Sequence, residues 1–214
     1  MKILFEDKYI LIVYKEAGIA SQPDSSNEKS LIEMAEEHTK TPLHIMTRLD
    51  RPVKGLVLFA KDKSTADNLT KMIQNHQITK IYHALVCGKV EKTGHIESYI
   101  MKNARLNISK IVNKGNVGAK LAILDYRLLE EKDNISRVEI DLKTGRHHQI
   151  RVQFASIGAP LYGDVKYNKE FKYKRGVTPA LCACRLIFKH PVTNEKIDIE
   201  INDNLNIEKG CSIR

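Results

Sequence analysis

Short apolar runs separated by polar turns recur along this chain and predict β-strands. The clearest are two runs that flank the acidic turn 6–8 and one continuous run that ends at Ala60. A turn at 190–194 joins the last two runs into a β-hairpin over about 181–201. Strands are therefore predicted at 2–5, 10–14, 56–60, 81–87, 119–129, 135–142, 181–188 and 197–201.

Helical spacing of apolar residues appears in three other segments. Ser30 followed by Glu33 has the sequence of a capping box and predicts a helix as far as about His38. Ser64 is predicted to cap a second helix. The third helix is predicted over 147–157, with one apolar face formed by Ile150, Phe154 and Ile157.

The order of these elements favours an α+β fold, because the strands pair locally and the helices interrupt them irregularly. Neither a GxGxxG nor a GxxxxGK[ST] pattern occurs, so we expect no doubly wound nucleotide-binding domain and no nucleotide cofactor. The chain has 214 residues, of which 42% are hydrophobic and 29% charged. These values are typical of one globular domain, which we predict over 1–214 with the C-terminal hairpin included.

Location and metal content follow from what the sequence lacks. No run approaches the ~20 apolar residues that cross a bilayer, and acidic residues occupy the place where a signal peptide has its apolar run. We therefore expect a cytoplasmic protein without membrane contact. The four cysteines are too sparse for a disulfide framework, and Cys182 and Cys184 fit small strand residues, so no metal site is expected.

Positive charge is concentrated in the middle of the chain. The formal net charge is +9, but residues 47–190 carry +14 and both ends are acidic. Residues 98–124 include five cations and no acid. A second basic stretch contains Lys172, Lys174 and Arg175, interleaved with Tyr167, Phe171 and Tyr173. Cations suit phosphates and rings suit unpaired bases, which favours RNA, but a merely soluble basic surface explains this composition equally well.

The densest group of reactive side chains surrounds Asp50. This residue stands between Arg48 and Arg51 in a predicted loop that leads into a buried strand. Neighbouring positive charge favours the ionised carboxylate, which can act as a nucleophile or a base. From the residues alone, a structural salt bridge at the strand entrance is the simpler interpretation.

Two further segments offer candidate site residues. In 143–152, Arg146 and Arg151 stand close to the predicted start of a helix and could hold phosphates or a carboxylate. The adjacent His147 and His148 point in different directions on a helix and have no evident third ligand, so a metal is not expected. Tyr82 lies on a short predicted strand, where its ring faces either a core or a pocket.

Several segments, in the same order, closely resemble the motifs of the RluA-type pseudouridine synthases, which isomerise uridine in ribosomal or transfer RNA. The motifs and their matches are ILYEDxxLLVVxKPAG at 3–18, HRLDRxTSGLLLFAK at 47–61, KxYxAxVxG at 80–88, TGRTHQIRVH at 144–153 and GHPLxGD at 158–164. The resemblance covers nearly the whole chain. It implies the pseudouridine synthase fold, which is α+β with a mixed, largely antiparallel sheet and flanking helices.

The resemblance also implies a role for individual residues. Asp50 matches the catalytic aspartate, Tyr82 the tyrosine that stacks on the target base, and Arg151 the basic residue that pairs with the aspartate. Ile150 is expected to form an apolar wall for the uracil. Arg48 is expected to fill the space left when the target nucleotide flips out of the RNA. The reaction needs no cofactor.

The sequence departs from the family pattern at five positions. Thr47 stands in place of His, Val53 and Lys54 replace Thr and Ser, His147 replaces Thr, and Gln153 replaces His. None of these changes removes a residue that the resemblance makes catalytic, so we expect an active enzyme. Whether the changes alter its choice of RNA is left open by the sequence. The alternative is an RNA-binding or RNA-folding module whose isomerase activity is lost or incidental.

The resemblance begins at Ile3, which leaves no room before it for the S4 RNA-binding domain that many relatives carry. We therefore expect a stand-alone catalytic domain that selects RNA, ribosomal or transfer, through its own basic surface. A monomer suffices, because each chain carries one set of catalytic residues.

Overall fold

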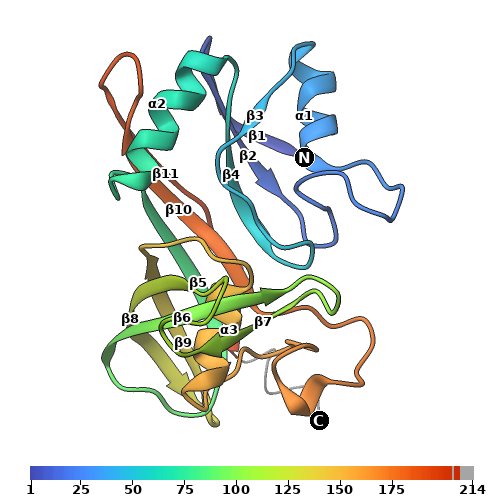
Figure 1. Cartoon of the computed structure of the whole chain (residues 1–214), viewed down its shortest axis with the longest axis vertical. Helices are drawn as coiled ribbons and strands as arrows, with labels where there is room; N and C mark the ends of the chain where they lie inside the picture. Colours follow the sequence, from blue (N-terminus) through green and yellow to red (C-terminus); the bar gives the residue numbers. More distant parts are fainter. Residues whose placement is uncertain (204, 208–214) are drawn as a thin grey trace. The chain divides into compact units, whose positions relative to one another are not determined.

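The computed structural model describes residues 1–203 and 205–207 (Figure 1). It divides into two compact units. Unit 1 contains Met1–Lys80 and Ala183–Asp203, and unit 2 contains Ile81–Cys182 together with the described residues that follow Asp203. The chain thus passes out of unit 1 within one strand and returns to it within another.

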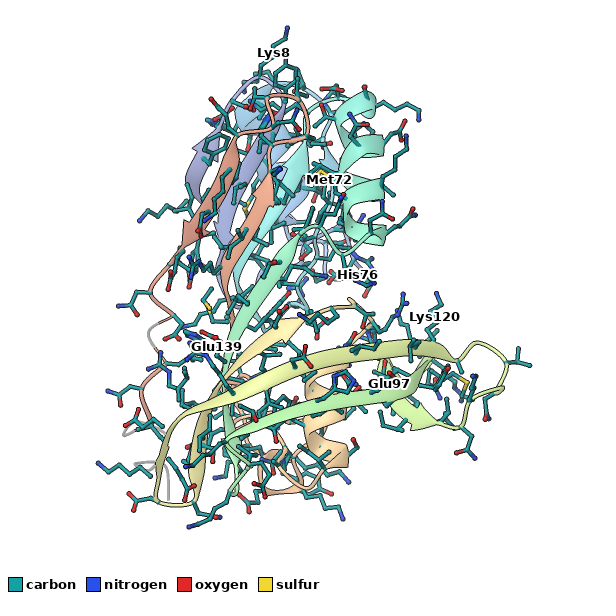
Figure 2. All side chains as sticks on the ribbon, turned by 90° about the vertical axis from the view of Figure 1, so that its left-hand side faces the viewer. Lys8, Met72, His76, Glu97, Lys120 and Glu139 are labelled. Carbon is teal, nitrogen blue, oxygen red and sulfur yellow. The ribbon has the colours of Figure 1, made fainter. Side chains whose placement is uncertain are left out.

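Unit 1 is a sheet with two helices, in which the neighbours β1–β2, β2–β4, β3–β4 and β10–β11 are antiparallel. Its strands follow the order β1-β2-β4-β10-β11, and the short β3 pairs with the end of β4. The bounds are β1 Lys2–Glu6, β2 Ile10–Lys15, β3 His44–Ile45, β4 Lys54–Ala60, β10 Leu181–Lys189 and β11 Lys196–Glu200, with helices α1 Leu31–Thr39 and α2 Lys63–Gln74. Apolar side chains of α2, including Met72 (Figure 2), pack against the core formed by these strands. This buried core gives the loops before β4 a rigid base.

Unit 2 is a second antiparallel arrangement, in the order β5-β9-β8-β6-β7. Its elements are β5 Thr79–Cys87, β6 Thr93–Asn103, β7 Ile108–Val112, β8 Lys120–Lys132, β9 Ile135–Leu142, helix α3 Gln149–Ser156 and a 3-10 turn η1 Lys169–Phe171. Val152 of α3 packs on Ile100 of β6 and Ala122 of β8. The helix that follows β9 is therefore held against the inner strands of this unit.

The structure confirms the predicted strands and corrects three details of the prediction. Helix α2 is capped by Asp62 rather than Ser64, because the Asp62 carboxylate accepts the Thr65 backbone N–H at 2.8 Å. Helix α3 begins at Gln149, and Ile157 lies beyond it with 46% of its surface exposed. The hairpin β6–β7 was not predicted, because polar residues interrupt its apolar residues and leave only short apolar stretches.

The other predicted features of the fold have mixed outcomes. At α1, the Glu33 carboxylate accepts the Ser30 backbone N–H at 2.8 Å, as the capping-box sequence predicted. Cys87, Cys182 and Cys184 form no disulfide bond with one another, and Cys211 lies outside the described residues. None of the described helices combines the length and the apolar character needed to cross a membrane. The prediction of one domain over 1–214 stays a prediction beside the two compact units.

Gly55 tests how closely β4 and β10 pack. Its φ is +128°, and a Cβ built there would lie 2.3 Å from the Ala183 carbonyl oxygen. Gly55→Ala should therefore lower the free energy of unfolding by roughly 2–5 kcal/mol, the combined cost of the backbone conformation and the clash. Gly18→Ala is the control, since Gly18 has φ +93° but nothing within 4 Å of the added atom. Urea unfolding that shows equal losses for both variants would contradict the close approach.

Candidate active site

The loop between β3 and β4 carries Asp50 and is fixed on both sides of it. Leu49 is buried, its backbone N–H donates to the Ser21 hydroxyl at 3.1 Å, and that hydroxyl donates to the Leu49 carbonyl at 2.7 Å. After Asp50, the Val53 N–H donates to the Asp50 carbonyl at 2.9 Å and closes a turn. The half-buried Asp50 carboxylate is therefore presented from a rigid loop in unit 1.

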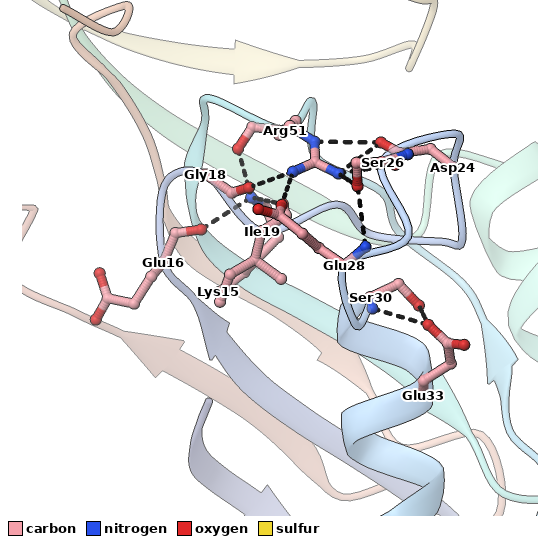
Figure 3. Close-up of polar contacts among 10 residues, drawn as sticks. All are labelled: Lys15, Glu16, Gly18, Ile19, Asp24, Ser26, Glu28, Ser30, Glu33 and Arg51. Atoms are coloured by element: carbon pink, nitrogen blue, oxygen red, sulfur yellow. Dashed lines mark hydrogen bonds and ion pairs between the residues drawn. The ribbon is translucent and has the colours of Figure 1, made fainter. Parts of the chain in front are cut away.

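Arg51 fastens this loop to the segment 18–28 (Figure 3). Its guanidinium donates to both Asp24 carboxylate oxygens at 2.8 Å, to the Gly18 carbonyl at 3.0 Å, and to Ser26 and Glu28. The carboxylates of Asp24 and Glu28 raise the pKa of Arg51, and Arg51 in turn lowers the pKa of Asp24 to about 2.

Arg48 also turns to this segment, because its guanidinium donates to the Gln22 amide oxygen at 3.2 Å. The two arginines flank Asp50 in the sequence, and the structure directs both guanidinium groups to segment 18–28. Arg51 holds the loop there, whereas most of Arg48 stays exposed.

Lys15 is the cation that the sequence prediction missed in unit 1. Its side chain is fully buried at the end of β2. The ammonium donates to the backbone carbonyls of Glu16, Ile19 and Arg51 at 3.0, 2.7 and 3.1 Å (Figure 3). Burial lowers the pKa of Lys15 to about 8, and the negative charge of Asp50 opposes this shift. A lysine that ends an apolar strand in the family's opening motif was the available signal.

Tyr82, Ile150 and Arg151 belong to unit 2, where all three are buried. Tyr82 lies on β5 opposite Ile140 of β9. Ile150 and Arg151 lie in the first turn of α3. The residue immediately before this helix, His148, has a left-handed backbone with a φ of 54°. The left-handed residue breaks the extended path after β9 and starts the helix just before the motif arginine.

Arg151 forms a buried ion pair with Asp164. The Arg151 Nε and Nη2 atoms donate to the two oxygens of the Asp164 carboxylate at 2.7 and 2.8 Å. Their side chains are 2% and 0% exposed. Such a two-point contact is strong and fixes the plane of the guanidinium. The sequence prediction placed Asp164 in the GHPLxGD motif but gave it no role. The predicted pairing of Arg151 with Asp50 stays a prediction.

Tyr167 connects this ion pair to neighbouring polar groups. Its ring lies 5.2 Å from the Arg151 guanidinium, and its hydroxyl lies 2.8 Å from His148 Nδ1 and accepts the Ser109 backbone N–H at 2.6 Å. Burial first, and then the positive charge of Arg151 and His147, lowers the pKa of His148 to about 2. His148 is therefore neutral at physiological pH and serves as a hydrogen-bonding group.

The remaining predicted binding residues lie on the surface of unit 2. Arg146 is exposed, and its Nε donates to the Leu121 carbonyl at 2.8 Å. Lys172, Lys174 and Arg175 are exposed as well. The aromatic residues between them do not all share this exposure, because Phe171 is buried against Tyr162 whereas Tyr173 is 85% exposed. The interleaved pattern thus overstated the number of rings available for stacking.

Comparison with known proteins identifies the family. The family model for RNA pseudouridylate synthase matches residues 9–156. The chain belongs to this family. A relative from Mycoplasma genitalium, described as an uncharacterised RNA pseudouridine synthase, is 32% identical over 92% of this chain and 65% of its own length. Ribosomal large subunit pseudouridine synthase D of Zymomonas mobilis is 29% identical over 94% of this chain and 68% of its own length.

Solved structures agree on the pseudouridine synthase fold. Human RNA Pseudouridylate Synthase Domain Containing 1 matches with a TM-score of 0.76 and 23% identity, over 94% of this chain and 82% of that chain. The RluA-type family and the α+β fold predicted from the sequence are confirmed, and with the family comes membership of an enzyme class, the RNA isomerases. This chain spans about two thirds of the length of the curated relatives named here.

The buried ion pair of Arg151 can be tested by Asp164→Asn. The amide keeps the shape but leaves the Arg151 charge without its counterion, so the free energy of unfolding should fall by about 3–5 kcal/mol. Asp198→Asn is the matched control, because Asp198 forms a similar two-point pair with Arg185 at the surface and should lose little. If urea unfolding showed the same loss of stability for both variants, the buried Arg151–Asp164 pair would contribute no more to stability than the surface pair.

The burial of Lys15 predicts a pH dependence of stability. The pKa of Lys15 is about 8 in the folded protein, whereas an ordinary exposed lysine has a pKa of 10.5. Between these two pH values the unfolded chain binds more protons than the folded protein, so the free energy of unfolding rises with pH. The free energy of unfolding of the wild type relative to Lys15→Met should increase by up to roughly 3 kcal/mol from pH 8 to 10.5. Urea titrations measure this difference, and Lys8→Met, at an exposed lysine, is the control. A difference that stays flat with pH argues against the shift.

Proposed function

We propose that this chain converts a specific uridine of structured RNA into pseudouridine. The observation that carries the proposal is the family match over 9–156, which includes Asp50, Tyr82 and Arg151. Because that match takes in residues of both compact units, we propose that 1–214 acts as one catalytic domain. The name of the Zymomonas relative favours large-subunit ribosomal RNA as the first substrate to examine, with transfer RNA as the second.

Asp50 is proposed to begin the reaction as an ionised carboxylate. The bond between ribose C1′ and uracil N1 breaks, the base turns, and C1′ bonds to uracil C5 instead. The carboxylate either adds to the nucleotide or removes a proton from the sugar, and both routes need its negative charge. The proton on C5 then leaves the base and N1 gains a proton, so atoms balance without a cofactor.

Tyr82, Ile150 and Arg151 are proposed to serve the uracil and the carboxylate. The buried ring of Tyr82 suits stacking on a base, and its hydroxyl suits transfer of the C5 proton. Ile150 supplies an apolar wall. Arg151, whose orientation Asp164 fixes, is proposed to pair with the Asp50 carboxylate and keep it ionised.

The target base has to leave its stack before any of these groups reaches it, at a cost of a few kcal/mol. We propose that the exposed Arg48 fills the space left in the RNA. Arg146 and the surface cations Lys172, Lys174 and Arg175 are proposed to hold phosphates. The enzyme is further proposed to act as a monomer in the cytoplasm.

Tritium release tests the activity. RNA from a strain lacking the gene, labelled with tritium at uracil C5, should release tritium when the purified protein is added. Asp50→Asn should reduce the rate on the order of 10³-fold or more, because it removes the negative charge. Tyr82→Phe retains the ring but loses the hydroxyl, so RNA binding should persist while turnover falls.

Two variants outside the proposed site are the controls. Asp67→Asn changes an exposed carboxylate of α2, and Tyr126→Phe removes a hydroxyl elsewhere in unit 2; both should turn over at the wild-type rate. Tight RNA binding by the wild type without any tritium release would favour the RNA-binding module instead. Mapping pseudouridines in wild-type and deletion-strain RNA then identifies the uridine.

A further inference from the structure

The hairpin β6–β7 and the loop that leads to β8 expose an unusual set of side chains. We call residues 102–120 the hairpin surface. It carries five exposed cations, which are Lys102, Arg105, Lys110, Lys114 and Lys120. Among the described residues none of the five forms an ion pair, and no acid interrupts them in the sequence. Lys120, where β8 begins, is labelled in Figure 2.

Exposed apolar side chains accompany these cations. Leu106 is 60% exposed, Ile111 37% and Val117 96%. Proteins generally leave such side chains exposed only singly, so three within twelve residues of a basic surface need an explanation. Leu106 lies at the tip of the hairpin, directly after Arg105, so it is the exposed apolar side chain that projects from the turn between β6 and β7.

The tip that presents Leu106 is held in place by hydrogen bonds. The Leu106 N–H donates to the Asn103 side-chain oxygen at 3.0 Å, and the Asn107 N–H donates to the Ala104 carbonyl at 3.2 Å. From the body of unit 2, the Lys166 ammonium donates to the Asn107 carbonyl at 2.7 Å. A tip fixed in this way loses little conformational entropy on binding.

His147 is the second brace of the tip. Its Nε2 atom lies 3.1 Å from the Asn107 side-chain oxygen, and its Nδ1 atom lies 2.8 Å from the Ser109 hydroxyl. His147 is one of the positions at which this sequence departs from the family motif, where Thr is usual. The position of Leu106 is thus tied to a residue at which this sequence departs from the family motif.

We propose that the hairpin surface binds the substrate RNA, with its cations on phosphates and Leu106 inserted against a base as a wedge. This inference rests on the proposed function, which makes RNA the partner. Unpaired cations suit a phosphate backbone, and an apolar side chain carried among them can enter a base step and unstack it. A protein partner fits less well, because lysine is depleted in the buried centres of protein interfaces.

Fluorescence separates the wedge from simple charge attraction. The probe is a short RNA stem-loop with 2-aminopurine in the stem, and the protein is the full chain carrying Asp50→Asn, so that turnover plays no part. Binding should raise the fluorescence as the base unstacks. Leu106→Ala should abolish most of this rise and weaken binding about tenfold. Leu129→Ala, at an exposed leucine beside Glu130 and Glu131, is the matched control and should change neither.

The cations are tested by salt dependence. Replacing both Lys102 and Arg105 with Gln should weaken RNA binding and reduce the slope of log affinity against log salt by about 0.7 for each phosphate that the protein no longer neutralises, while the fluorescence rise at saturation persists. Lys92→Gln, at an exposed lysine outside the hairpin surface, should leave the slope unchanged. Circular dichroism should show the same thermal midpoint for all these variants, because each altered side chain is exposed.

Three results would overturn the inference: no fluorescence rise with the parent protein, a full rise with Leu106→Ala, or an unchanged salt slope in the double variant. Loss of binding to intact ribosomal subunits, with binding to naked RNA unaffected, would assign the hairpin surface to a protein partner instead. These readouts do not involve turnover, so they stand apart from tritium release, whose absence would overturn the proposed function alone.

Discussion

Among the residues that the structure describes, the two largest side chains that are almost completely buried are both cationic, Lys15 in unit 1 and Arg151 in unit 2. A buried charge is costly unless oxygen acceptors surround it, so each cation dictates where the chain around it has to run. Lys15 gathers three carbonyl groups, one of them from the loop that carries Asp50. Arg151 requires the carboxylate of Asp164, which in turn holds the backbone of the segment that follows it.

Both arrangements place a motif residue on backbone that has little freedom. In unit 1, Lys15 and Arg51 together tie the Asp50 loop to segment 18–28, so the backbone that carries the carboxylate keeps one position. In unit 2, the ring of Tyr167 and the carboxylate of Asp164 fix the guanidinium of Arg151 from different directions. Orientation of reacting groups is a large part of what an enzyme contributes to rate. The polar scaffold around the motifs therefore matters as much as the motifs.

Sequence patterns predicted the features that depend on local physics. Continuous apolar runs marked β2, β4 and β10, and the Ser30–Glu33 spacing marked the start of α1. The cap of α2 was misplaced because Asp62 and Ser64 are both good capping residues, and only the backbone path decides between them.

Partnerships between distant residues were out of reach of such patterns. The Asp164 partner of Arg151 stands thirteen positions along the chain and the Arg51 carbonyl thirty-six from Lys15, so no spacing rule connects them. Local charge and spacing marked Asp50, Tyr82 and Arg151 as candidates, but only the family resemblance gave them catalytic roles. The hairpin β6–β7 was missed because polar residues interrupt its apolar residues irregularly, so neither a continuous apolar run nor a sustained alternation appears.

Unit 1 is formed by two separate segments, 1–80 and 183–203, so the ribosome synthesises its first segment well before its second. In its sheet, β4 has β10 as a neighbour, and β10 is synthesised only after nearly all of unit 2. Until then the nascent chain has an apolar strand with an open edge, which is the kind of surface that aggregates or recruits chaperones. A premature stop between codons 80 and 183 would therefore leave unit 1 unfinished, although Asp50 itself would already have been synthesised.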